Sequence, residues 1–210
     1  LARWRSAGIW TMKTIAVLLC SAMVYVTVFN ISVWKNSISL WEYTIEREPK
    51  RIPIAYGYLG EALEAAGRID RAIESYSTAI SLSPYYADAY VDRSIALRKM
   101  GQIDRAVDDI SHAIAIDPSN IKAYAFRGQI FKDIGLFSRA IEDYTKLITL
   151  QTELQEGAIG QHNRPIEEFA TKMYLHNDLY ESYTKRGIVY KEMNRYDRAI
   201  EDYTKAIELN

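Results

Sequence analysis

The chain has 210 residues and a formal net charge of −1, from 26 Lys and Arg against 27 Asp and Glu side chains. This balance argues against a generally basic nucleic-acid binder, and a composition that is 49% hydrophobic and 25% charged is typical of a folded protein. The single cysteine, Cys20, excludes an internal disulfide framework, and three histidines are too few for a His-rich metal centre. We therefore expect no metal, no cofactor and no nucleic-acid partner.

Residues 14–34 form an apolar stretch without a charge, glycine or proline. A helix of this length rises roughly 30 Å, which matches the hydrocarbon core of a bilayer. The sequence therefore predicts a transmembrane helix at 14–34, preceded by an N-terminal flank at 1–13. An alternative is a signal peptide that starts at Met12, but no small-x-small cleavage site follows the apolar run.

The charges that flank this segment favour one orientation. The N-terminal flank carries Arg3, Arg5 and Lys13, whereas Lys35 stands alone next to the other end. Basic residues prefer the cytoplasmic side. We therefore expect the rest of the chain to be extracytoplasmic.

One pattern recurs four times in the remaining sequence, at residues 65–84, 99–118, 133–152 and 192–210. The first three copies are offset by 34 residues. Each copy has a turn residue suited to the left-handed conformation, a candidate helix N-cap, a small packing residue and a bulky residue. In that order these are Gly67, Asp70, Ala72 and Tyr76; Gly101, Asp104, Ala106 and Ile110; Gly135, Ser138, Ala140 and Tyr144; and Asn194, Asp197, Ala199 and Tyr203.

This pattern resembles the tetratricopeptide repeat, a pair of antiparallel helices whose copies stack into a right-handed superhelix. The resemblance implies an all-α solenoid after the transmembrane helix. Before the first full copy, residues 36–50 have the pattern of an isolated second helix. The expected order is a half-repeat helix at 36–50, repeats at 53–86, 87–120 and 121–154, an insertion at 155–179, and a truncated fourth repeat at 180–210.

The resemblance also implies where a partner binds, because the first helices of such repeats line the concave groove. By repeat register the candidate groove residues are Ile54, Glu61, Glu64, Asp88, Val91, Arg98, Lys99, Lys122, Gln129, Lys132, Asp133, Glu181, Lys191 and Glu192. Four of them, Arg98, Lys99, Lys122 and Lys132, are basic residues of the two middle repeats. We expect a protein or peptide partner there, with acidic character.

Two functions fit these features. The first is a membrane-tethered scaffold that binds a protein or peptide, with the membrane contacted through 14–34. The second follows from residues 1–60, which resemble the region after the last span of polytopic, lipid-sugar-dependent membrane glycosyltransferases with tetratricopeptide tails. No catalytic residue of that family maps onto this sequence, and no phosphate-binding loop, nucleophile elbow or zinc motif is present. We therefore expect this chain itself to be non-catalytic.

Overall fold

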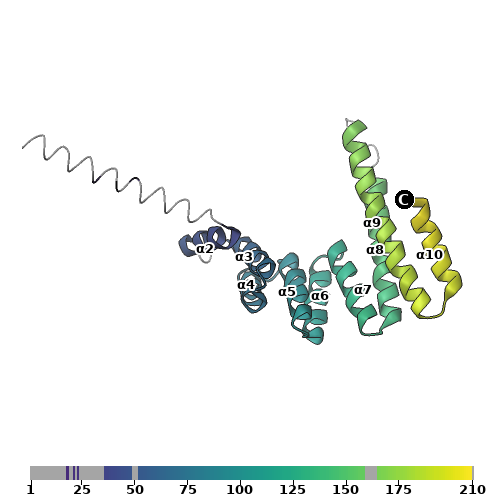
Figure 1. The fold of residues 1–210 in the computed structure, drawn as a ribbon, viewed down its shortest axis with the longest axis horizontal. Helices are drawn as coiled ribbons and strands as arrows, with labels where there is room; N and C mark the ends of the chain where they lie inside the picture. Colours follow the sequence, from purple (N-terminus) through teal and green to yellow (C-terminus); the bar gives the residue numbers. More distant parts are fainter. Residues whose placement is uncertain are drawn as a thin grey trace, which may run out of the picture. The chain divides into compact units, whose positions relative to one another are not determined.

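The computed structural model describes residues 36–48, 52–158 and 165–209, together with Leu18, Ser21 and Met23. All regular secondary structure in these ranges is helical (Figure 1). The predicted transmembrane helix at 14–34 lies outside the described residues apart from those three positions. Within the described part of the chain, no helix combines the length and the apolar character needed to cross a bilayer.

The described helices alternate as the repeat pattern predicts. They are α2 (Ser37–Arg47), α3 (Pro53–Ala65), α4 (Ile69–Leu82), α5 (Ala87–Lys99), α6 (Ile103–Ile116), α7 (Ile121–Asp133), α8 (Phe137–Ala158), α9 (Pro165–Glu192) and α10 (Tyr196–Leu209). The odd-numbered helices from α3 onward are first helices of a pair, and the helix after each is its second helix. This order confirms an all-α helical repeat fold.

The helices fall into two compact units, residues 1–78 and 79–210, with the boundary inside α4. In the first unit, Trp41 of α2 stacks on Tyr58 of α3 with ring centroids 4.9 Å apart. Arg71 of α4 also donates to the Glu42 carboxylate of α2 at 2.9 Å. The half-repeat helix therefore contacts the first repeat through both rings and charges.

The turns inside the repeats adopt the expected left-handed conformation. Gly67, Gly101 and Gly135 have φ of 74°, 74° and 76°, and Asn194, which replaces glycine in the last copy, has φ of 57°. A residue with a side chain is strained at such φ, and Asn tolerates it best. The turn positions were therefore predicted correctly.

The predicted N-caps of the second helices are wrong, because these residues lie inside the helices. Helix α6, for example, already begins at Ile103, so Asp104 lies within its first turn, and the capping position is Gln102 without a side-chain cap bond. An acidic residue in the first turn still complements the positive end of the helix dipole. Side-chain caps occur instead at Asn36 before α2 and Asn120 before α7, whose Oδ1 atoms accept from Ser39 and Ala123 N–H at 2.9 and 3.0 Å.

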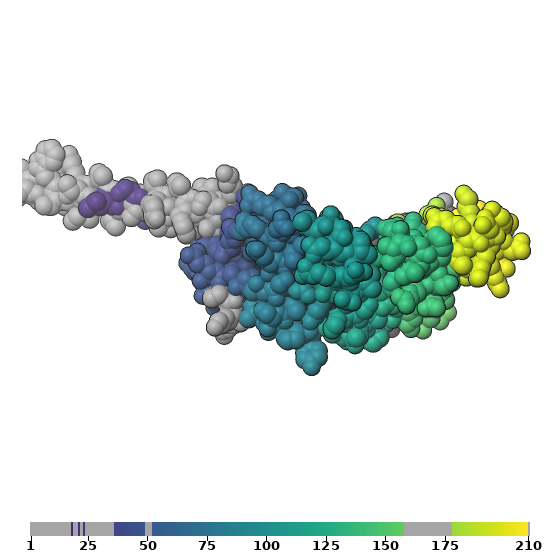
Figure 2. All heavy atoms as spheres, turned by 90° about the horizontal axis from the view of Figure 1, so that it is seen from below, coloured from purple at the N-terminus to yellow at the C-terminus, as the bar shows by residue number. Residues whose placement is uncertain are grey.

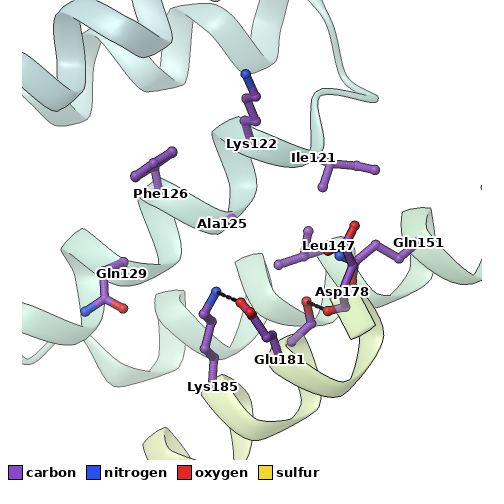
Figure 3. A pocket seen from close by; sticks show the side chains of 11 residues that line it. Ile121, Lys122, Ala125, Phe126, Gln129, Leu147, Gln151, Asp178, Glu181 and Lys185 are labelled. Carbon is purple, nitrogen blue, oxygen red and sulfur yellow. Dashed lines mark hydrogen bonds and ion pairs between the residues drawn. The ribbon is translucent and has the colours of Figure 1, made fainter. Parts of the chain in front are cut away.

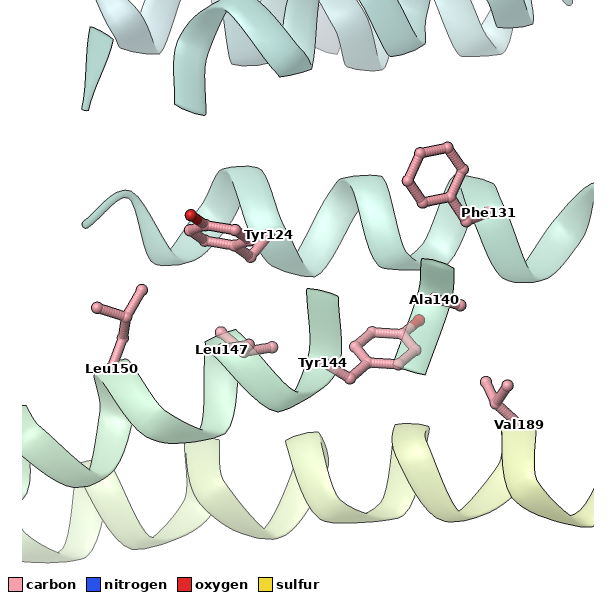
Figure 4. Close-up of a cluster of buried hydrophobic side chains, with 7 residues drawn as sticks. All are labelled: Tyr124, Phe131, Ala140, Tyr144, Leu147, Leu150 and Val189. Carbon is pink, nitrogen blue, oxygen red and sulfur yellow. The ribbon is translucent and has the colours of Figure 1, made fainter. Parts of the chain in front are cut away.

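The core of the second unit runs along the facing sides of consecutive helices. One cluster joins α7, α8 and α9 through Tyr124, Phe131, Ala140, Tyr144, Leu147, Leu150 and Val189 (Figure 4). Within it, Gly128 of α7 lets the Tyr144 ring approach so closely that a Cβ atom at Gly128 would lie 2.9 Å from Tyr144 Cε1. The pairing of a small residue with an aromatic ring thus sets how near the two helices of a repeat lie.

The predicted insertion is mostly helical. Second helices α6 and α10 have 14 residues each, whereas α8 has 22 and α9 has 28, and both extend beyond their neighbours (Figure 1). Helix α6 ends before Pro118, but the corresponding residue of the next repeat is Thr152, whose hydroxyl donates to the Ile148 carbonyl at 2.8 Å. Because no proline stops the helix there, α8 continues into the insertion.

The last helix, α10, differs from α6 and α8 in exposure. Ile114 of α6 and Ile148 of α8 pack at least partly into the core, whereas Ile207, at the corresponding position of α10, is 74% exposed. Ile200 and Tyr196 on the same helix are 62% and 57% exposed. Helix α10 lies at the end of the second unit (Figure 2).

Candidate functional site

The structure sorts the predicted groove residues by exposure. Exposed are Ile54, Glu61, Asp88, Lys99, Lys122, Asp133, Glu181, Lys191 and Glu192, and partly buried are Glu64, Arg98, Gln129 and Lys132. Val91 is only 1% exposed and belongs to a core cluster with Ile110 and Ala113. Its choice as a contact residue is wrong, because that position of α5 faces the second helix of its own repeat.

Four of the predicted residues form one polar network at the C-terminal ends of α5 and α7. The Asp133 carboxylate accepts from the Arg98 guanidinium of the neighbouring repeat and from Gln129 Nε2 at 2.6 Å. Lys132 Nζ lies 3.9 Å from the same carboxylate. Arg98 and Lys132 are therefore paired with an acidic residue, which the sequence pattern did not suggest.

The four predicted cations do not gather at one point. Lys122 begins α7 and Lys132 ends it, so ten residues of helix, roughly 15 Å of rise, separate them. Arg98 and Lys99 are the last two residues of α5, and Arg98 reaches Asp133 at the end of α7. The basic cluster around Asp133 thus consists of Arg98 and Lys132, with Lys99 next to Arg98 in the chain, and Lys122 belongs to a different part of the surface.

Three Arg–Asp pairs, each with a buried aspartate and a partly buried arginine, recur inside the repeats, and the sequence reasoning missed them. Each arginine comes from a first helix and makes two hydrogen bonds of 2.7 to 2.9 Å with an aspartate sixteen residues later, in the second helix. The pairs are Arg93–Asp109, Arg127–Asp143 and Arg186–Asp202. Their aspartate hydrogen bonds raise the pKa of all three guanidinium groups, although burial opposes this.

Two of these arginines also reach the preceding repeat. Arg127 Nη1 donates to the Ser111 hydroxyl at 3.3 Å, and Arg186 Nη1 donates to the Thr145 hydroxyl at 3.0 Å. Each of these two pairs therefore connects three helices. The sequence does contain a signal for these pairs, because an Arg and an Asp recur at the same two positions in the second, third and fourth repeats. The first repeat has Leu59 and Ser75 at these positions.

A pocket of about 370 Å³ opens where α7 and α9 flank α8 (Figure 3). It contains three of the predicted groove residues, Lys122, Gln129 and Glu181. Its lining is Ile121, Lys122, Ala125, Phe126, Gln129, Leu147, Gln151, Asp178, Glu181, Ser182 and Lys185, which we call the groove pocket. The groove pocket is thus lined by the first helices α7 and α9 together with Leu147 and Gln151 of the second helix α8.

The charges of the groove pocket come mainly from α9. Lys185 Nζ pairs with the Glu181 carboxylate at 3.1 Å. Burial, together with the nearby negative charge of Glu181, raises the pKa of Asp178, while Lys185 acts in the opposite direction. In the described part of the chain no group of three or more His, Cys, Asp or Glu could hold a metal ion. The pocket thus offers binding chemistry: apolar walls with carboxylate and amide groups among them.

Comparison with known proteins places the chain in a family. Sequence models described as tetratricopeptide repeats match residues 34–87, 63–130, 121–153 and 180–210. No curated protein matches. The comparisons therefore give no support to the predicted likeness to glycosyltransferases.

Several solved structures share the fold. A crystal structure of MamA is 22% identical over 82% of this chain and 85% of its own, with a TM-score of 0.64. MamA from Desulfovibrio magneticus RS-1, from residue 41 to its end, is 18% identical over 90% and 94%, also with a TM-score of 0.64. TTC0263, a thermophilic protein with these repeats from Thermus thermophilus, is 19% identical over 89% and 88%, with a TM-score of 0.57. At these identities the likeness shows the fold alone, and the chain belongs to the tetratricopeptide repeat family.

Proposed function

We propose that this protein is a membrane-tethered scaffold that binds a protein or peptide partner through the first helices of its second unit. Repeat folds of this kind present extended concave surfaces that bind partners. The observation that carries the proposal is the groove pocket between α7 and α9, which combines apolar walls with charged and amide groups. Such a mixture suits a peptide, whose side chains need both kinds of contact.

The membrane part of the proposal rests on residues 14–34. Their length and lack of charge suit a bilayer span, and the basic residues before them favour an extracytoplasmic repeat array. Extraction of membranes with alkaline carbonate tests the anchor. We expect the full chain to stay with the membrane and a chain with two arginines introduced into 14–34 to be released; retention of both would contradict the anchor.

The basic cluster around Asp133 favours a partner segment with acidic residues. Arg98 and Lys132 bring two positive charges to the Asp133 carboxylate, and Lys99 adds a third at the next position of α5. An acidic side chain that binds there gains from the remaining charge, and the gain falls with salt because the site is partly exposed. Reversing two charges, with Lys99→Glu and Lys132→Glu, should weaken an acidic peptide; unchanged affinity would contradict this part of the proposal.

Selection of peptides from a random display library against the full chain tests the central proposal. We expect the selected peptides to lose about tenfold or more in affinity for Ala125→Arg, which fills the groove pocket. Ala115→Arg is the matched control, because Ala115 is exposed on the second helix α6. Equal affinity for both variants would show that the peptides bind elsewhere.

A further inference from the structure

Gln151 is a buried polar residue without a complete set of partners. Its side chain belongs to α8 and the residue is 4% exposed, yet within the described part of the chain nothing donates a hydrogen bond to its Oε1 atom. Leaving a buried acceptor unsatisfied destabilises the fold. Gln151 also lines the groove pocket, but its Oε1 atom is itself buried, so a ligand can supply the missing donor once the Gln151 amide turns toward the cavity.

The neighbouring repeat shows why this acceptor is unusual. The residue at the same register in α6 is Asp117, which ends that helix. Its carboxylate is already occupied, because it accepts from Ser119 N–H at 3.0 Å and from the Ser119 hydroxyl at 2.6 Å. In α8 the helix continues past Thr152, so Gln151 lies within the helix and is buried. The insertion therefore creates an acceptor that the regular repeat lacks.

The groups around Gln151 select the kind of donor. Asp178 and Glu181 of α9 line the same pocket, and Phe126 and Ile121 of α7 provide apolar walls. Two cations line the pocket: Lys122, whose side chain points away from Gln151 (Figure 3), and Lys185, whose ammonium is already paired with the Glu181 carboxylate at 3.1 Å. A group with several N–H donors, a positive charge and a flat or apolar body fits this surrounding.

We propose that the groove pocket binds an arginine side chain of the partner, with the guanidinium donating to Gln151 Oε1 and to the Asp178 carboxylate. This inference rests on the proposed function and names the residue that the partner must contribute. A guanidinium carries five donors, pairs well with carboxylates and packs against aromatic rings. It therefore suits the Gln151 acceptor, the Asp178 carboxylate and the Phe126 ring of this pocket. The burial that disfavours the Asp178 charge in the empty pocket is then offset by the bound cation.

Ligand-observed NMR with the full chain tests the inference. The probes are acetyl-Gly-Arg-Gly-amide and the same peptide with citrulline, which keeps the shape of arginine and removes its charge. We expect the arginine peptide to bind about tenfold more tightly than the citrulline peptide, as for loss of a hydrogen bond to a charged group. Equal binding of the two peptides, or tighter binding of a glutamate peptide, would overturn the inference.

Two variants connect the effect to the pocket. Gln151→Met keeps the volume and removes the acceptor, and Asp178→Asn removes the charge. Each should weaken the arginine peptide severalfold, and Gln151→Met should leave the melting temperature unchanged or higher, because an unsatisfied buried acceptor is lost. Gln102→Met is the matched control, since Gln102 lies in the α5–α6 turn outside the pocket.

The two proposals fail differently. If peptides selected from the library are blocked by Ala125→Arg but bind Gln151→Met as they bind the parent chain, the arginine inference is wrong and peptide binding at this face stands. If Ala125→Arg does not weaken them, peptide binding at this face is itself wrong.

Discussion

Partly buried arginines at the same register connect the two helices of three repeats. In the Arg127–Asp143 pair the side chains are only 20% and 5% exposed, and two hydrogen bonds of 2.9 and 2.7 Å hold them together. A pair of this kind stabilises little compared with well-packed apolar residues, but removal of one partner leaves a buried charge. The contribution of the pair to the fold is therefore best measured by removing one of its two side chains.

Asp143→Ala should lower the free energy of unfolding by about 1–3 kcal/mol, because it removes the two hydrogen bonds that the partly buried Arg127 guanidinium donates to this carboxylate. Urea-induced unfolding followed by circular dichroism measures the loss. The control is Glu201→Ala, which removes the partner of Arg198 in a pair whose side chains are 64% and 62% exposed. That change should have no measurable effect, and a similar loss for both variants would contradict the assigned role.

A second residue-level feature is the match between Gly128 and Tyr144. The second repeat has Ser94 and Ile110 at these positions, a larger residue facing a smaller one. Gly128→Ser alone should destabilise by about 1–3 kcal/mol through overpacking against the ring. The double variant Gly128→Ser with Tyr144→Ile reproduces the residues of the second repeat. Its loss in the free energy of unfolding should be smaller than the sum of the losses of the two single variants. Strict additivity in thermal unfolding would show that the two positions do not compensate.

At the level of elements, the absence of a helix stop shapes the groove pocket. Pro118 follows α6, whereas Thr152 lies within α8, and the longer α8 carries Gln151 into the groove pocket. The position that ends α6 thus lies inside α8 and lines a pocket there.

Thr152→Pro should restore the helix stop and disturb the extended pair of helices. A proline inside a helix costs about 3 kcal/mol, because it removes a hydrogen bond and clashes with the carbonyl four residues earlier. We expect lower helicity by circular dichroism and a reduced melting temperature. Thr149→Ala on the exposed side of the same helix serves as the control and should change neither. Unchanged helicity in Thr152→Pro would show that a proline at this position does not end α8, and would contradict the role given to Thr152.

For the molecule as a whole, the regular part of the fold was predictable from the sequence. The 34-residue recurrence of Gly67, Gly101 and Gly135 depends on local backbone conformation, which a sequence pattern records directly. Val91 was misplaced because repeat register gives the helix but not which of its sides is buried. The pairing of Arg98 with Asp133 depends on a contact between two repeats. The burial of the Gln151 acceptor depends on the length of α8. The sequence pattern of a single repeat contains neither kind of information.

Photocrosslinking tests most directly the central claim that the first helices of the second unit bind the partner. A photoreactive phenylalanine replaces Phe126, which lines the groove pocket, or Lys146, which is exposed on the second helix α8. Peptides selected by the full chain should crosslink from position 126 and not from position 146. Crosslinking from position 146, with none from position 126, would contradict the account.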